Sequence, residues 1–410
     1  MLAFTFPGQG SQRPGMGRAW IDHPSWEVVE EASAVAGRDL ASLLLDADAT
    51  ELTLTANAQL ATFVLSLVVL DAVERLGLVP GAVAGHSLGE YTALVASGSL
   101  AFEEGVQLVM ERGDAMHHCA DERPGTMAAV MGADDDAVEA ACERVEGEVW
   151  IANFNAPGQV VIAGTPDAVA EAGRIAKELG ARKIVPFPVA GAFHTDLMAP
   201  ARPRLRKALA GTTFLDPEVP VVANVDARAH QEAGQWPGLL SAQLCSPVRW
   251  RQVVSTLARL GVTCLAELGP GGVLTGLARR IEPEVRAISV AVPEDLDVLV
   301  DAAAGNESWH AYAASHQGER LYTSERVVVS PGPGEFIPEP LAGVVGPADL
   351  ARTPSGQAMI GVGDLIGRVG SAEVRSPFAG ELVAFLAHPS ERVVEGQPVA
   401  WLRVSPDERS

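Results

Sequence analysis

The sequence predicts an α/β fold with an inserted subdomain, followed by an all-β domain, on three observations. Strand-like and helix-like segments alternate through residues 1–305, and such alternation favours a parallel sheet covered by helices. A different pattern interrupts the alternation at about 126–190. After a stretch at 306–325, residues 326–404 lose the helical pattern, and Pro, Gly and Val recur there in short runs. We therefore expect two domains joined by a linker at 306–325.

The first domain should open with an apolar strand and a Gly-rich turn, followed by helices and further strands. Strands are expected at Leu2–Phe6, from Ala82 and at Cys264–Leu268, and helices at Trp26–Ala36, Ala58–Leu76 and from about Leu88. The apolar run Leu60–Val73 is interrupted by polar residues and is shorter than a bilayer-spanning helix. We therefore expect a buried helix there and no membrane partner.

The inserted subdomain has its own order of elements. Strands are expected at Thr126–Met131, Glu148–Phe154, Gln159–Ala163 and Lys183–Val189, and helices at Asp134–Arg144 and Asp167–Leu179. This βαββαβ order predicts a ferredoxin-like subdomain.

The C-terminal domain contains an internal repeat. Val329-Ser330-Pro331 followed by Gly334-Glu335 is echoed by Arg375-Ser376-Pro377 followed by Gly380-Glu381. Two related halves made of short strands predict a compact β-sandwich with internal two-fold symmetry.

Composition excludes several classes of protein. A net charge of −22 argues against a nucleic-acid partner, because phosphate binding needs a basic footprint. The four cysteines lie far apart and form no CxxC pair, so we expect neither a metal site nor a disulfide framework. No targeting segment is recognisable, and we expect a cytoplasmic protein.

A candidate nucleophile lies where the second strand meets a helix. Gly85-His86-Ser87-Leu88-Gly89 is a GxSxG sequence, and between a strand and a helix its serine would stand on a sharp elbow at the helix N-terminus. A chance Gly/Ser turn is the alternative, and the strand–turn–helix context favours the nucleophile Ser87.

A serine nucleophile needs a base, and the chain has nine histidines. His86 would point away from Ser87 at such an elbow. His194 follows the strand that closes the inserted subdomain, a loop position at a domain junction where catalytic groups are common. For the other histidines a structural role is the simpler interpretation, so we expect His194 to be the base.

Arg112 lies on an apolar face of the helix expected at Phe102–Met116. Such an arginine either extends its charged end to solvent or meets an anion, which a guanidinium binds in a bidentate pair. The position of Arg112 on the helix, taken alone, favours the interpretation in which its charged end extends to solvent. The glycines of the turn after the first strand would let a backbone N–H approach a ligand and stabilise an oxyanion, although an ordinary turn is equally consistent.

Together these motifs resemble the malonyl-CoA:acyl carrier protein transacylase family of fatty-acid and polyketide synthesis. The resemblance covers residues 1 to about 300. It rests on Pro7-Gly8-Gln9-Gly10-Ser11-Gln12, Gly85-His86-Ser87-Leu88-Gly89-Glu90-Tyr91, Arg112-Gly113, Asn155-Ala156-Pro157-Gly158-Gln159, Gly191-Ala192-Phe193-His194 and Glu267-Leu268-Gly269-Pro270-Gly271. It implies an α/β-hydrolase-like large subdomain around the ferredoxin-like one.

The resemblance implies roles for the candidate residues. Ser87 would form the malonyl ester, and His194 would be the general base. A backbone carbonyl near Gln243 would orient the histidine, which leaves Asp196 a bystander. Arg112 would pair with the malonyl carboxylate.

Four further site residues follow from the same resemblance. The backbone amides of Gln9 and Leu88 would form the oxyanion hole, and Gln59, like Gln243, would line the site. Phe193 matches malonyl-selective members, because its ring would crowd the α-methyl group of methylmalonyl.

The implied reaction is a ping-pong transfer of malonyl from malonyl-CoA, the substrate, to the phosphopantetheine thiol of an acyl carrier protein, the partner. No bound cofactor is implied. An acyl hydrolase that edits stalled carriers with Ser87 and His194 is the alternative, and Arg112 would then have less purpose.

The C-terminal repeat resembles a biotinyl/lipoyl-type hammerhead domain. Such carriers need a lysine on the hairpin between the halves, and here that hairpin, Arg368–Glu373, has none. The lysines of the chain are Lys177, Lys183 and Lys207. We therefore expect no biotin or lipoate and instead a docking role with a protein partner. In a third interpretation the whole chain is an assembly factor that acts through this domain.

Overall fold

The computed structural model describes residues 1–189, 191–303, 325–339, 359–378, 380–387, 389–394 and 396–403. It divides into two compact units. The first consists of residues 1–72 and 80–309 and contains the elements up to α13 (Asp295–Ala303) apart from a short segment at 73–79. The second consists of that segment and residues 310–410, with the strands from β11 (Glu325–Val329) onward. Nearly all of the expected linker at 306–325 lies outside the described residues, so the domain boundaries stay a prediction.

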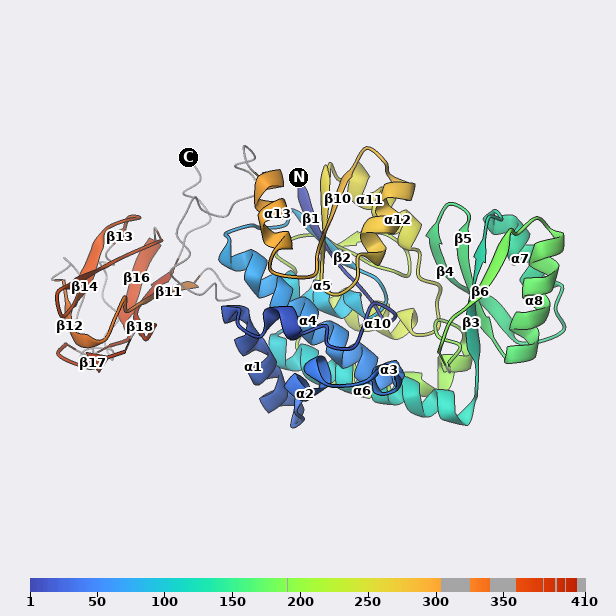
Figure 1. Cartoon of the computed structure of the whole chain (residues 1–410), viewed down its shortest axis with the longest axis horizontal. Helices are drawn as coiled ribbons and strands as arrows, with labels where there is room; N and C mark the ends of the chain where they lie inside the picture. Colours follow the sequence, from blue (N-terminus) through green and yellow to red (C-terminus); the bar gives the residue numbers. More distant parts are fainter. Residues whose placement is uncertain are drawn as a thin grey trace. The chain divides into compact units, whose positions relative to one another are not determined.

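The first unit is built on a six-stranded sheet in the order β10-β9-β1-β2-β7-β8. Strands β10, β1 and β2 of this sheet are labelled in Figure 1. Its strands are β1 (Leu2–Phe6), β2 (Ala82–Gly85), β7 (Val221–Val222), β8 (Ala229–His230), β9 (Cys264–Leu268) and β10 (Arg286–Val290). Neighbouring strands are parallel except β7 and β8, which are antiparallel. The predicted parallel sheet is confirmed, and β1 and β9 are buried along their whole length, as in sheets covered on both faces.

Helices surround this sheet (Figure 1). They are α1 (Glu27–Ala36), α2 (Leu40–Leu45), α3 (Ala49–Thr53), α4 (Thr55–Arg75), α5 (Gly89–Ala96), α6 (Phe102–Glu122), α9 (Arg202–Ala210), α10 (Trp236–Gln243), α11 (Trp250–Arg259), α12 (Val273–Ile281) and α13. Trp250 and Val253 of α11 and Leu277 of α12 share one core with Ala3 and Ala84 of the sheet. These contacts hold α11 and α12 against the strands that carry the site.

Helix α4 is longer than the sequence indicated. Its 21 residues are enough, by length and composition, to cross a membrane, so the argument that the run is too short was wrong. However, 89% of its most apolar window is buried inside the structure, as in the core helix of a globular domain. The predicted buried helix is therefore confirmed.

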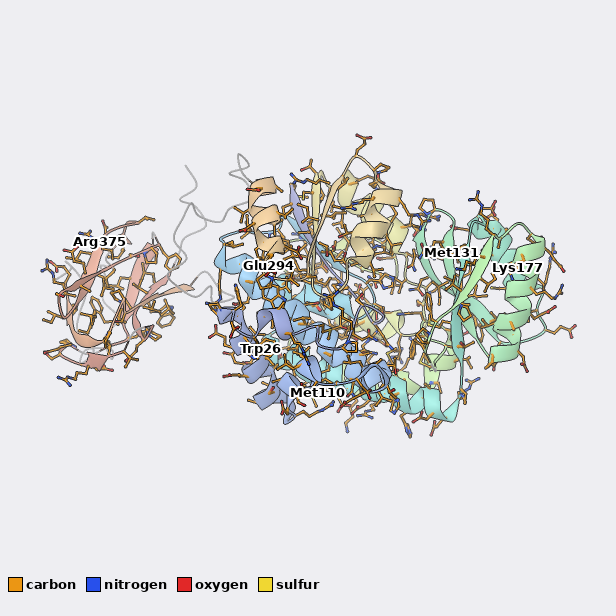
Figure 2. The ribbon with its side chains drawn as sticks, in the orientation of Figure 1. Trp26, Met110, Met131, Lys177, Glu294 and Arg375 are labelled. Carbon is orange, nitrogen blue, oxygen red and sulfur yellow. The ribbon has the colours of Figure 1, made fainter. Side chains whose placement is uncertain are left out.

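The inserted subdomain has the predicted βαββαβ order. Its elements are β3 (Thr126–Met131), α7 (Asp135–Glu143), β4 (Val149–Ala156), β5 (Gln159–Gly164), α8 (Pro166–Glu178) and β6 (Lys183–Pro186). The strands form an antiparallel sheet in the order β4-β5-β3-β6, with both helices on one face (Figure 1). Met131 on β3 and Lys177 on α8 mark this sheet and its outer helix in Figure 2. Strand β6 ends at Pro186, before the predicted Val189. In the register of β6 with β3, Val189 would face residue 125, and β3 begins only at Thr126, so Val189 has no partner in the sheet.

From residue 325 onward, the described elements of the second unit are all strands. They are β11, β12 (Gly334–Pro338), β13 (Met359–Ile360), β14 (Leu365–Val369), β15 (Ala372–Arg375), β16 (Gly380–Phe385), β17 (Arg392–Val393) and β18 (Pro398–Arg403). One sheet has the order β11-β18-β16-β13 and the other β15-β14-β12-β17. Exchanging the first four strands with the last four converts one order into the other, as a two-fold repeat requires.

Hydrogen bonds repeat in the same way. Ser330 and Ser376 each donate through Oγ to the carbonyl two residues ahead, at 2.6 Å in both halves. The backbone N–H of Ser330 donates to the carbonyl of Gln397, and that of Ser376 to the carbonyl of Asp364, each at 2.8 Å. The predicted internal repeat is confirmed in these contacts, whereas the hammerhead resemblance stays a prediction.

Candidate active site

Ser87 stands on a sharp turn between β2 and α5. Its φ of 53° lies in the left-handed region, which is strained for a residue other than glycine. Two glycines permit the turn. A Cβ on Gly85 would lie 1.8 Å from the carbonyl of Gly89, and one on Gly89 would lie 2.1 Å from the carbonyl oxygen of Phe6. The GxSxG sequence thus folds as an elbow that presents its serine at the N-terminus of α5.

His194 lies against this serine. Ser87 Oγ is 2.7 Å from His194 Nε2, and His194 Nδ1 is 2.9 Å from the backbone carbonyl oxygen of Gln243. The carbonyl can only accept, so Nδ1 carries the proton and Nε2 accepts from the serine hydroxyl. His194 is itself strained, with φ of 63°. The acceptor that orients the ring is a backbone carbonyl, and Asp196 has no part in orienting it.

Arg112 on α6 is buried, with 1% of its surface exposed. Its Nη2 donates to Ser87 Oγ and to Gln243 Oε1, each at 3.0 Å, and its Nη1 donates to Gln59 Oε1 at 2.6 Å. Among the described residues, its Nε has no hydrogen-bond partner. Its guanidinium carbon lies 5.3 Å from the centre of the Tyr91 ring. The extension to solvent that position alone favoured was therefore wrong, because four neighbouring elements enclose the charge.

Burial controls the protonation states of the site. Burial, and secondly the charge of Arg112, lower the pKa of His194 to about 3, so the imidazole is neutral at neutral pH, as a general base must be. Burial also lowers the pKa of Arg112, and Tyr91 and Glu90 oppose that effect. Burial raises the pKa of Glu90 to about 7, against hydrogen bonds from its neighbours.

A cavity of about 480 Å³ opens beside Ser87 and His194. Gln9, from the loop after β1, and Phe193 line it as well. The remaining wall combines apolar side chains, among them Met116, Met127, Phe187, Val189, Leu274 and Leu277, with polar ones, among them Gln12, Asn153, Asn155 and Gln159. The cavity therefore lies between the larger subdomain and the inserted one, with Ser87 on its wall.

The other predicted residues lie behind this cavity rather than on its wall. Leu88, Gln59 and Gln243 are buried and are absent from its lining, as is Arg112, which meets the cavity through Ser87. His86 does line the cavity, but its Nε2 lies 3.0 Å from Asn155 Oδ1, so it is bonded away from Ser87.

Two residues of the site were missed in the sequence. Asn224 follows β7; its Oδ1 accepts the backbone N–H of Ser87 and its Nδ2 donates to the carbonyl of Gly85, each at 2.7 Å. Glu90 accepts the backbone N–H of Asn224 at 2.7 Å. A polar residue just beyond the carboxyl end of a parallel strand was the available signal for Asn224, because ligand sites of α/β sheets lie at that edge.

The arrangement is suited to acyl transfer through a serine ester. It contains a nucleophile, a neutral base bonded to it, and a buried cation beside both. The chain as described offers no acidic third member, which separates this site from a hydrolase triad of serine, histidine and acid.

Comparisons with known proteins agree with this chemistry. Residues 3–291 match the family model of the acyl transferase domain. The malonyl CoA-acyl carrier protein transacylase of Escherichia coli (strain K12) is 43% identical over 307 residues, which cover 73% of this chain and 99% of that protein. The Bacillus subtilis (strain 168) protein of the same name is 40% identical over 304 residues, which cover 73% and 96%.

The fold agrees too. A malonyl-transacylase solved in complex with a type II PKS acyl-carrier protein is 38% identical, with a TM-score of 0.71 over 73% of this chain and 99% of that one. The family model, the relatives and the geometry around Ser87 coincide over the same residues, and we conclude that the chain belongs to the acyl transferase domain family and, within it, to the malonyl CoA-acyl carrier protein transacylases.

Proposed function

We propose that the protein transfers a malonyl group from malonyl-CoA to the phosphopantetheine thiol of an acyl carrier protein, as an [acyl-carrier-protein] S-malonyltransferase. The observation that carries the proposal is the buried Arg112 beside a serine–histidine pair, since it offers a carboxylate a cationic partner next to the nucleophile. The relatives named above support the substrate and the carrier.

In the first half-reaction Ser87 Oγ attacks the thioester carbonyl while His194 Nε2 takes the hydroxyl proton. The backbone N–H groups of Gln9 and Leu88 hold the oxyanion, helped by the positive end of the α5 dipole. The C–S bond then breaks, and the imidazolium returns its proton to the departing CoA thiolate. The product is the malonyl ester of Ser87.

The second half-reaction is the same sequence in reverse with a new thiol. His194 takes the proton of the phosphopantetheine thiol, whose sulfur attacks the Ser87 ester. When the tetrahedral intermediate collapses, the serine oxygen leaves and receives the proton from the imidazolium. The apolar cavity wall contributed by α12 and the inserted subdomain suits the pantetheine arm that both thiols share.

Arg112 supplies selectivity for a carboxylate. Its Nη2 bonds Ser87 Oγ in the free enzyme, and this oxygen becomes an ester oxygen, a weaker acceptor, after acylation. Nη2 and the unpartnered Nε are then available to the malonyl carboxylate in a bidentate pair. Phe193 adds a limit on size beside the base, and competition between malonyl-CoA and methylmalonyl-CoA should favour malonyl.

Mass spectrometry of the protein with malonyl-CoA, and then with holo carrier protein, tests the function. We expect a malonyl adduct on Ser87 that passes to the carrier. Loss of the adduct to water without carrier product would establish the hydrolase instead.

For the second unit we propose a hammerhead-like docking domain that takes no biotin or lipoate. The hairpin between β14 and β15 turns at Gly370 and Ser371, and it offers no lysine amine for an amide bond. The two-fold pairing of its strands supports the fold.

Deleting residues 320–410 tests this role. We expect transacylase activity within about twofold of the full chain and loss of a protein partner that the isolated segment captures. Unchanged activity, oligomeric state and partner binding together would contradict a docking role.

A further inference from the structure

A carboxylate is buried directly behind the nucleophile. Glu90, in the first turn of α5, is fully buried. Its Oε1 accepts the backbone N–H of Asn224 at 2.7 Å, and its Oε2 accepts from Gln243 Nε2. Both oxygens face N–H donors, which favours the ionised carboxylate against the burial that raises its pKa to about 7; the acid would turn an O–H against a donor.

The side chain of Gln243 links this carboxylate to the catalytic groups. Its Nε2 donates to Glu90 and to the carbonyl oxygen of Ser87, the latter at 2.8 Å, while its Oε1 accepts from Arg112 Nη2 at 3.0 Å. Rotating the amide by half a turn would set its NH2 group against the guanidinium and its oxygen against two acceptors. Of the two acceptors of Gln243 Nε2, Glu90 is the charged one and the Ser87 carbonyl is neutral. Charge-assisted hydrogen bonds are stronger than neutral ones, so Glu90 contributes most to the orientation of the amide.

We propose that Glu90 is a positioning residue: it fixes the Gln243 amide so that its oxygen holds Arg112 in place to receive the malonyl carboxylate. This inference rests on the proposed malonyl transfer. The carboxylate does not touch the substrate or the reacting atoms. Its effect reaches Arg112 through one side chain, and reaches the strained Ser87 backbone through Gln243 and Asn224.

Glu90→Gln tests the inference with little change in volume. The new amide can keep its oxygen on the Asn224 N–H, and its NH2 group then faces Gln243 Nε2, which drives the Gln243 amide to rotate. We expect kcat/KM for malonyl-CoA to fall by about tenfold to hundredfold, the usual effect of an unsatisfied buried donor, mainly through KM. The value for acetyl-CoA, which has no carboxylate for Arg112, should fall less, so the malonyl/acetyl ratio falls.

Glu267→Gln is the matched control. Glu267 is another buried carboxylate in the same unit, and it accepts the backbone N–H groups of Leu274 and Thr275 at 3.1 and 2.7 Å. Glu267→Gln removes an acceptor from a backbone donor, as Glu90→Gln removes one from Gln243. We expect it to lower the midpoint of thermal unfolding and to leave the malonyl/acetyl ratio unchanged.

A double-mutant comparison decides whether Glu90 acts through Gln243. In a Gln243→Ala background, adding Glu90→Gln should no longer change the malonyl/acetyl ratio. An equal loss with both acyl-CoA substrates, or the same further fall of the ratio in the Gln243→Ala background, would overturn the inference. Should Glu90→Gln not fold, Glu90→Asp keeps both acceptor oxygens at a shorter reach and should lower the ratio in the same direction.

The proposed function fails separately from this inference. If the unmodified protein forms no malonyl ester on Ser87, the function is wrong and the inference falls with it. If the ester forms and the ratio is unchanged in Glu90→Gln, the positioning role alone is wrong.

Discussion

Ser87→Ala is expected to lower kcat/KM for malonyl transfer by about 10⁴- to 10⁶-fold, the range seen when an enzyme loses its serine nucleophile. The alanine has no oxygen to form the ester, so the malonyl adduct should vanish from the mass spectrum. The buried base and the elbow backbone remain, so the variant should still fold and bind malonyl-CoA.

His194→Ala should show a loss of the same size, and the double variant Ser87→Ala, His194→Ala should be no slower than either alone. The two groups act as a unit, joined by the 2.7 Å contact between Oγ and Nε2, and effects within such a unit are not additive. His230→Ala is the control, because His230 bonds Asp226 and Gln235 away from the site. Steady-state kinetics that show multiplied losses would mean that His194 does not serve Ser87.

Arg112→Gln has the next largest expected effect, a fall of about 30- to 3,000-fold in kcat/KM for malonyl-CoA, as for one partner lost from a buried hydrogen-bonded charge pair. Transfer from acetyl-CoA should fall much less, so the preference for malonyl is lost or reversed. The measurement is initial rates with both acyl-CoA substrates. Arg174→Gln, on the exposed ion pairs of α8, is the control and should keep the preference. An equal fall for both substrates would contradict a carboxylate-binding role.

The same variant should change the pH dependence of the reaction. The charge of Arg112 helps to lower the pKa of His194, so its removal raises that pKa from about 3 toward the ordinary value. A base with a raised pKa is protonated at higher pH. The acid limb of kcat/KM for acetyl-CoA should therefore move upward in Arg112→Gln. Burial is the larger cause of the low His194 pKa, and it remains in the variant. The midpoint of the acid limb should therefore stay below pH 6.5, the ordinary pKa of histidine.

Element types along the chain could be predicted from local pattern, and element ends often could not. β1 and β9 have the bounds expected from their apolar runs, which turn residues enclose. Helix α6 continues to Glu122, beyond the expected Met116. Cys119 and Ala120 in its last turns are buried, so packing against the rest of the domain stabilises these turns. Tertiary packing extends a helix that the apolar pattern alone would end.

The sequence by itself determined the serine elbow, the inserted βαββαβ subdomain, the repeat in the β domain and its lack of a lysine. These features can be read from the order of residues along the chain: from glycine spacing, from periodicity, from a repeated motif and from the absence of a lysine. Tertiary structure alone decided that Arg112 is buried and that Asn224 and Glu90 support the elbow. The carbonyl of Gln243 that orients His194 was expected from the family resemblance, and the contact itself forms only in the folded chain. Ser87 and His194 are 107 residues apart and Arg112 and Gln243 are 131 apart, so no local pattern encodes contacts that exist only once the sheet and helices have packed.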